Sequence, residues 1–238
     1  MGVPFTAMKR LVIATLALLP VTVAAAGISV FVEGQFVSFT DVGSTAWFAT
    51  YVRQAAEGGI VSGYKSADGK LTGTFGPADK VTIAQSLKTA VLGAGYDPTL
   101  FAPAVGPDHW AVQYVGVALD KDFQRVFTEP SQFDRPATRA EVAQLITDAF
   151  DVDVETPIGN RYDDVGFSTQ HGFAIEALSR DGVVSGDTDV SGNAVGRFRP
   201  GDTINRAETV KIIINARAKY GQPGRGKSSS TDDNTPLE

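Results

Sequence analysis

The chain has 238 residues, a net charge of −6 and a sequence pI of about 5.0. This acidic balance argues against a nucleic-acid binder, which would usually carry a basic stripe. There is no cysteine, so disulfide frameworks, thiolate catalysis and cysteine metal sites are excluded. A composition of 43% hydrophobic and 20% charged residues is ordinary for one or two globular domains.

Residues 1–26 have the pattern of a secretory signal peptide. Lys9 and Arg10 precede an apolar run at 11–23, and the alanines at 24–26 form a small-residue cleavage site. The run is short for a membrane span, which needs about 20 residues, and an uncleaved anchor is the alternative. Either way, we predict that the protein is exported.

The next elements are a lead-in segment and two helices. Residues 27–38 are β-prone and are expected to form either a strand or an extended linker. Ser44 or Thr45 can then cap a helix that ends at two glycines. A second helix is predicted from Thr82, which forms a capping box with Gln85 three residues on.

The start of this second helix recurs twice along the chain. Thr138 with Glu141, and Asn205 with Glu208, have the same capping arrangement. The last unit repeats the first without a gap, since adding 123 to position 63 gives Gly186 and adding 123 to position 82 gives Asn205. Several matches at one offset indicate duplication, and the middle unit is a shorter, more divergent copy.

We therefore predict a mainly α fold of three helix–loop–helix units, each of roughly 60 residues. One such unit has too little apolar surface to stand alone, so neighbouring units must pack together, and three can close as a pseudo-threefold bundle. Residues 222–238 are poor in apolar side chains and are expected to be a disordered tail. The predicted units span residues 39–98, 99–156 and 157–221.

Two arginines stand out at the helix starts. Arg139 and Arg206 lie in the first turn, where the helix dipole disfavours a cation by up to about 1 kcal/mol. Such a placement makes sense if an anion docks on free backbone N–H groups beside the guanidinium. Each arginine could instead pair with a nearby carboxylate such as Glu141 or Glu208. In the first unit Ile83 takes the place of the arginine.

The order of these motifs resembles the S-layer homology module. Phe-x-Asp-Val, a helix with Trp, Gly-Ile/Val-Val-Ser-Gly, Phe-x-Pro and Thr-Arg-Ala-Glu follow one another across residues 39–220. The resemblance implies a three-repeat, mostly helical, pseudo-threefold domain. It also implies grooves between adjacent repeats that bind a wall-linked polysaccharide, often one with a pyruvate ketal. The residues that it nominates for polysaccharide binding are Arg139, Arg206, Trp47, Trp110, Gly63, Gly186, Glu141 and Glu208.

The three predicted units do not all contain every residue of the family motif. Ile83 replaces the arginine in the first unit, Val126 replaces the loop glycine in the second, and Gln170 replaces the tryptophan in the third. If a groove needs an arginine, at most two of three can be complete. Trp47 and Trp110 also have another interpretation, because aromatic residues at helical spacing are often core.

The sequence gives little indication of a catalytic site or a metal site. His109 and His171 are the only histidines, and neither accompanies a recognisable nucleophile motif. Residues 187–192 resemble the start of a calcium loop, but Phe198 stands at the twelfth position, where a bidentate Glu is needed. We expect a polar turn there, no catalytic residue, no metal and no cofactor.

These features favour a non-catalytic anchoring module at the bacterial cell wall or cell surface, not an enzyme. Its expected partner is an anionic, pyruvylated cell-wall polysaccharide or peptidoglycan-linked polymer. The alternative is a structural surface-layer protein whose repeats mediate protein–protein assembly with a surface-layer partner. No nucleic-acid partner and no membrane span after signal removal are expected.

Overall fold

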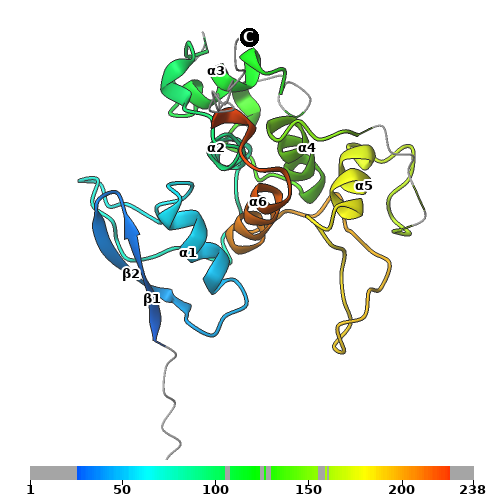
Figure 1. The fold of residues 1–238 in the computed structure, drawn as a ribbon, viewed down its shortest axis with the longest axis horizontal. Helices are drawn as coiled ribbons and strands as arrows, with labels where there is room; N and C mark the ends of the chain where they lie inside the picture. The colour runs from blue at the N-terminus through cyan, green and yellow to red at the C-terminus, as the bar shows by residue number, and fades with distance from the viewer. Residues whose placement is uncertain are drawn as a thin grey trace, which may run out of the picture.

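A computed structural model describes residues 26–104, 108–123, 126, 130–154, 159 and 161–225 (Figure 1). The predicted signal peptide up to residue 25 and the tail beyond residue 225 lie outside the described residues. The described part of the chain holds six α-helices and one two-stranded sheet, so the mainly α prediction is confirmed. None of these helices is long and apolar enough to cross a membrane.

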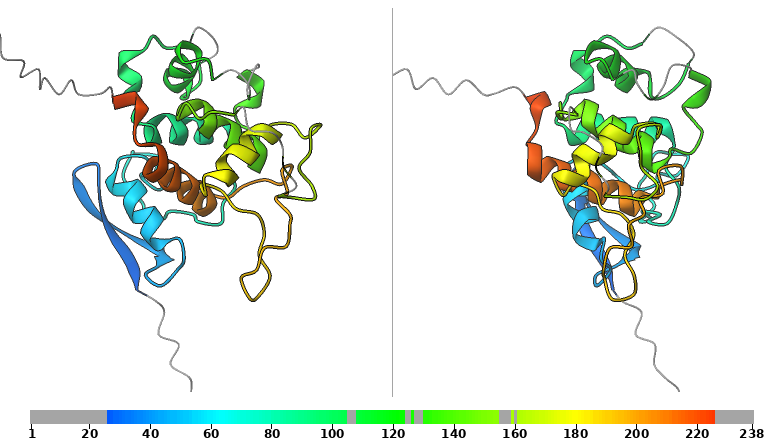
Figure 2. Two further views of the ribbon diagram at one scale, coloured as in Figure 1. Left: turned by 45° about the vertical axis from the view of Figure 1, so that its right-hand side comes forward. Right: turned by 90° about the vertical axis from the view of Figure 1, so that its right-hand side faces the viewer.

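The lead-in segment is a strand of a β-hairpin. Strand β1 (Gly27–Val32) pairs antiparallel with β2 (Gln35–Gly43) through a turn at Glu33 and Gly34, which have φ angles of 48° and 81°. Such positive values at both central residues match the twist of a tight hairpin. The alternate residues Ile28, Val30 and Val32 are buried, and β1 packs on the first helix (Figure 2).

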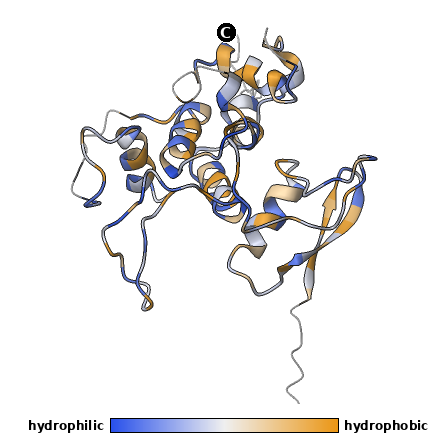
Figure 3. Cartoon of the chain, turned by 180° about the vertical axis from the view of Figure 1, so that it is seen from behind, coloured by the Kyte–Doolittle hydropathy of each residue, from blue (hydrophilic) through white to orange (hydrophobic). Residues whose placement is uncertain are grey.

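Six helices follow one another along the described chain. Helix α6 lies at the centre, with α1 and the hairpin to one side and α4 and α5 to the other (Figure 1). Polar and apolar residues mix along each helix (Figure 3). The bounds are α1 Ala49–Glu57, α2 Ile83–Gly93, α3 Val112–Asp120, α4 Arg139–Ala149, α5 Gly172–Arg180 and α6 Arg206–Tyr220, with 3-10 turns η1 Pro98–Leu100, η2 Pro130–Gln132 and η3 Pro223–Arg225.

The first helix begins later than predicted. Its N-cap is Phe48, which makes no side-chain capping bond, so neither Ser44 nor Thr45 caps it. These two residues lie instead in the turns that follow β2. The predicted end is confirmed, since α1 stops at Gly58.

All three predicted capping boxes are present. The side chain of Asn205 accepts from the N–H of Glu208 at 2.8 Å, and a carboxylate oxygen of Glu208 accepts from the N–H of Asn205 at 3.0 Å. Thr82 with Gln85 at α2 and Thr138 with Glu141 at α4 do the same. Local sequence therefore determines where the second helix of each pair starts.

The first N–H groups of these helices are not free. The N–H of Arg206 donates to the carbonyl of Asp79 at 2.9 Å, and that of Arg139 donates to the carbonyl of Asp202 at 2.9 Å. The N–H of Ile83 donates likewise to the carbonyl of Arg135 at 3.1 Å. The expectation that an anion docks on open helix N-termini is therefore wrong, because a turn from a neighbouring unit occupies them.

The segments before these three helices form a closed ring of hydrogen bonds. The N–H of Val81 donates to Ile204 at 3.2 Å, Ile204 to Ala137 at 3.2 Å, and Ala137 back to Val81 at 2.9 Å, in each case to the carbonyl oxygen. Helices α2, α4 and α6 contact one another beside this ring. Their buried faces form much of the core, including Ile83, Leu87, Leu145, Ile146 and Ile213.

A hydrogen bond ties the end of α5 to the end of α6, and an ion pair lies beside it. The hydroxyl of Tyr220 donates to Asp181 Oδ2 at 2.8 Å, and Arg180 Nε lies 2.9 Å from Asp181 Oδ1. The Arg180 hydrogen bond, supported by Tyr220, lowers the pKa of Asp181 to about 2.

We expect Asp181→Asn to lower the free energy of unfolding at pH 7 by about 1 kcal/mol, a value discounted for the exposure of the Arg180 side chain. Because the folded pKa is depressed, this stability is present above the unfolded pKa of 3.8 and is lost as pH falls through about 2. Urea unfolding at pH 7 and pH 2.5 should therefore show a difference between the two proteins that shrinks in acid. Asp120→Asn, at a more exposed pair with Lys121, is the control; an equal loss there would contradict the prediction.

Candidate functional site

Arg139 reaches from α4 to the unit that follows it. Its Nε donates to the carbonyl of Phe198 at 2.8 Å, and its Nη2 donates to the carbonyl of Ser185 at 3.2 Å. The guanidinium carbon lies 4.7 Å from the centre of the Phe198 ring, and Nη1 lies 3.7 Å from Glu208 Oε1. The Arg139 side chain is 10% exposed. It is therefore held between α4, the loop of the last unit and α6.

Arg206 repeats this arrangement between the last unit and the first. Its Nε donates to the carbonyl of Phe75 at 2.8 Å, and its guanidinium lies 4.7 Å from the Phe75 ring centre and 5.0 Å from that of Tyr64. It forms no ion pair with a residue in the described ranges. Burial lowers the pKa of both arginines, as it does for cations removed from water.

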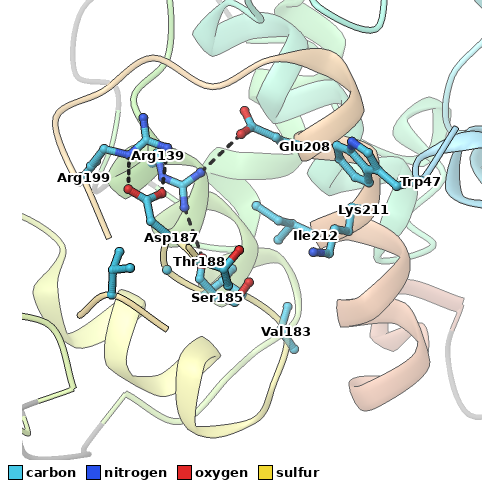
Figure 4. Close-up of a pocket in the computed structure, with 13 residues that line it drawn as sticks. Trp47, Arg139, Val183, Ser185, Asp187, Thr188, Arg199, Glu208, Lys211 and Ile212 are labelled. Carbon is cyan, nitrogen blue, oxygen red and sulfur yellow. Dashed lines mark hydrogen bonds and ion pairs between the residues drawn. The ribbon is translucent and has the colours of Figure 1, made fainter. Parts of the chain in front are cut away.

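Each arginine lies at the edge of a pocket. The Arg139 groove has a volume of about 580 Å³ and opens between the loop after α5 and the face of α6 (Figure 4). The Arg206 groove has a volume of about 330 Å³ and opens between the loop after α1 and α2. The Arg139 groove is lined by Arg139, Ser185, Gly186, Glu208, Lys211 and Trp47 among others. The Arg206 groove is lined at the corresponding places by Arg206, Ser62, Gly63, Gln85, Lys88 and Trp110.

The two tryptophans are exposed, so their interpretation as core residues is wrong. Trp47 is 56% exposed and Trp110 is 51% exposed. Each lies just before a helix and lines a groove whose loop belongs to a different unit. Each groove therefore takes its arginine, its loop and its tryptophan from three distant segments of the chain.

The loop glycines allow close packing beneath each groove. A Cβ at Gly63 would lie 2.7 Å from the Phe39 ring, and one at Gly186 would lie 2.6 Å from the Tyr162 ring. Gly63 also has a φ of +78°, which L-residues rarely adopt. These glycines therefore line the grooves because no larger residue fits over the aromatic ring below.

The two glutamates have different places. Glu208 lines the Arg139 groove, as noted above. Glu141 is 7% exposed, lines neither groove, and accepts from Arg135 Nη1 at 2.9 Å. The suggested ion pair of Arg139 with its own Glu141 is absent among the described contacts, because Arg135 takes that carboxylate.

Three residues depart from the repeat pattern, one in each predicted unit: Ile83 in the first, Val126 in the second and Gln170 in the third. Ile83, at the arginine position, is fully buried, and Gln170, at the tryptophan position, is exposed. Val126, at the glycine position, is half-buried. None of these three side chains is a cation or an aromatic ring, so these positions do not form a third groove of the same kind.

Sequence reasoning missed two lysines. Lys88 lines the Arg206 groove and Lys211 lines the Arg139 groove. The Lys211 ammonium lies 5.7 Å from the Trp47 ring centre, and burial lowers the pKa of Lys88. The repeat comparison could have found them, since adding 123 to position 88 gives 211. A single lysine on a helix face does not by itself indicate a binding site.

The loop of residues 187–192 is a polar turn, as expected. Asp189 Oδ1 accepts from the N–H of Ser191 at 2.8 Å and from the N–H of Asn193 at 3.0 Å. In the described ranges no three His, Asp or Glu side chains are arranged to hold a metal ion. Asp189, at the third position of the suggested calcium loop, therefore shapes the turn, and Asp187, at the first position, is paired with Arg199.

Comparisons with known proteins agree with the motifs. Residues 38–85 and 162–210 match the family model of the S-layer homology domain. The middle cell wall protein of Brevibacillus brevis is 28% identical over 117 residues, which cover 49% of this chain and 10% of that protein. The chain thus spans about a tenth of the length of this curated relative. Together, the two matched regions and this relative support an S-layer homology domain protein.

Proposed function

We propose that this chain is a non-catalytic anchoring module that binds an anionic polysaccharide of the bacterial cell wall in the Arg139 and Arg206 grooves. The sugar that carries the charge is a pyruvylated one, and the protein acts after export, at the cell wall or cell surface. Support comes from the S-layer homology matches and from the cell-wall name of the relative.

One observation carries this proposal: the same composite groove is built twice. An arginine from one unit, a Ser-Gly loop from the next and a tryptophan from another meet at both places. The stability of a single unit does not require these three side chains to converge at a hollow. A shared ligand explains why both grooves contain the same parts.

The chemistry of the parts fits a sugar acid. A guanidinium can grip a carboxylate with two parallel hydrogen bonds, and it does so more strongly away from bulk water. The exposed indole offers a flat apolar face for the C–H side of a sugar ring. The adjacent lysine adds a second positive charge, which draws an anionic polymer despite the net negative charge of the protein.

The architecture that fits this function is a pseudo-threefold one. Three units, at 39–98, 99–156 and 157–221, would meet at the ring formed by Val81, Ala137 and Ile204. The cyclic hydrogen bonds and the mutual contacts of α2, α4 and α6 support this arrangement. In such a domain the middle unit completes the core and supplies Arg139 and Trp110, while its own loop has Val126 at the place of the glycine.

A pull-down on purified wall sacculi tests the proposal. We expect the protein to bind untreated sacculi and to lose most of its binding after the polymer carboxylates are reduced to alcohols, because the arginines then lack an anionic partner. Binding that survives carboxylate reduction would contradict an anion-directed site. Self-association with no affinity for the wall would instead point to a surface-layer assembly protein.

A further inference from the structure

The two grooves differ at one position that decides how free the arginine is. Glu208 lines the Arg139 groove, whereas Gln85 stands at the corresponding place in the Arg206 groove, since 85 plus 123 is 208. We propose that the two grooves bind the same sugar acid unequally: the Arg206 groove is the strong site, and Glu208 weakens the Arg139 groove by competing for its arginine. This inference rests on the proposed function and adds a ranking of the sites and the residue that sets it.

The hydrogen bonds of the two arginines show the difference. Both use Nε to hold a backbone carbonyl, of Phe198 or of Phe75. Arg139 also commits Nη2 to the carbonyl of Ser185 and has Nη1 3.7 Å from Glu208. Arg206 has no such contact at either terminal nitrogen in the described part of the chain. A bidentate carboxylate needs two guanidinium N–H groups, so it meets prepared donors only at Arg206.

The charges around each groove point the same way. The Arg139 groove has carboxylates at Asp187 and Glu208, and its second arginine, Arg199, is paired with Asp187 at 2.7 Å. Arg199 thus balances Asp187, and Glu208 is the carboxylate that an incoming anion would approach beside Arg139 in a partly desolvated hollow. The only cation of that groove outside an ion pair among the described residues is Lys211.

The Arg206 groove carries fewer opposing charges. Its one lining carboxylate, Glu33, is paired with Lys65 at 2.8 Å. Lys88 and Arg206 form no ion pair within the described ranges. An anion that enters this groove thus meets two cations without first displacing an internal partner. The larger volume of the Arg139 groove does not offset this difference, because a cation already held by a carboxylate gains little from a second one.

Exchanging the two side chains tests the idea without disturbing the helix starts. Gln is as good as Glu at the third position of a capping box, and Gln85 already serves there in α2. Glu208→Gln should therefore leave α6 capped, and Gln85→Glu should leave α2 capped. Thermal unfolding of both variants checks that the fold is intact.

The two tryptophans of the chain report on one groove each, since Trp47 lines the Arg139 groove and Trp110 lines the Arg206 groove. We would label the full chain with 5-fluorotryptophan and assign the two ¹⁹F resonances with Trp47→Phe and Trp110→Phe. The probe titrated is a methyl hexoside with a 4,6-linked pyruvate ketal, and the same hexoside without the ketal is the control ligand.

We expect the Trp110 resonance of the unsubstituted chain to shift at a ketal concentration roughly fivefold lower than the Trp47 resonance does. Glu208→Gln should lower the Kd reported by Trp47 by about fivefold and leave that of Trp110 unchanged, and Gln85→Glu should raise the Kd reported by Trp110 by a similar factor. Equal dissociation constants in the unsubstituted chain, or no effect of Glu208→Gln, would overturn the ranking while leaving the proposed function intact. If neither resonance responds to the ketal, the proposed function fails and the ranking fails with it.

Discussion

Arg206→Gln is expected to weaken binding of a carboxylated wall polysaccharide at the Arg206 groove by roughly 100-fold, the effect of losing one partner of a close charge pair. The side chain lines the Arg206 groove with its terminal nitrogens uncommitted, so its loss removes the main anchor for the anion. Titration with soluble wall polymer at fixed ionic strength, read at the ¹⁹F resonance of Trp110, measures the change at this groove. Thermal unfolding is recorded alongside, because the guanidinium also packs on Phe75.

The matched control is Arg225→Gln, which removes the same charge from an exposed residue that lines neither groove. We expect that variant to bind almost as the unsubstituted protein does. Equal losses in the two variants would show that the polymer responds to overall charge and not to the groove, and would contradict the role given to Arg206.

Gly63→Ala is expected to lower the free energy of unfolding by about 2–4 kcal/mol. Two effects add. The φ of +78° is unfavourable for alanine, and the new Cβ would lie 2.7 Å from the Phe39 ring and 2.8 Å from the carbonyl oxygen of Thr74. Urea unfolding, followed by circular dichroism, measures the loss. Because this loop forms one wall of the Arg206 groove, binding at that groove should fall as well.

Gly59→Ala separates the two effects. Gly59 has a φ of +70°, but a Cβ there would have nothing within 4 Å. The expected loss is about 1 kcal/mol, from the left-handed backbone alone. Losses of the same size at Gly59 and Gly63 would contradict the steric account, because only Gly63 faces an aromatic ring and a carbonyl.

The sequence predicted the second helix of each pair well because its start is specified locally. A capping side chain and its partner three residues on are both visible in the chain, as for Asn205 and Glu208. The start of the first helix was predicted less accurately. Helix α1 starts without a side-chain cap at Phe48, so its beginning depends on packing that local sequence does not reveal.

The hairpin illustrates a second limit. The sequence shows the alternation of Ile28, Val30 and Val32. Whether this segment forms a strand or an extended linker depended on finding a partner strand. That partner begins at Gln35 and overlaps the residues that had been assigned to the first repeat motif. A two-residue turn of Glu and Gly is a weaker signal than the usual Asn-Gly pair.

The composition of the grooves could be predicted only in part. Repeat positions singled out the arginines, tryptophans and glycines that line them. They did not show that Arg139 contacts Phe198, 59 residues further on, or that Trp47 would face the loop of the last unit. Such contacts depend on how the units close on one another, which periodicity alone does not specify. The same repeat comparison could have identified Lys88 and Lys211 as groove residues.

The central claim is that a carbohydrate acid lies between an arginine of one unit and a tryptophan of another. A crystal structure of the protein with the pyruvylated methyl hexoside tests this most directly. We expect the ketal carboxylate about 2.8 Å from the terminal nitrogens of Arg206, with the sugar ring against Trp110. A hexoside found on another face of the molecule, with both grooves vacant at saturating ligand, would contradict the account.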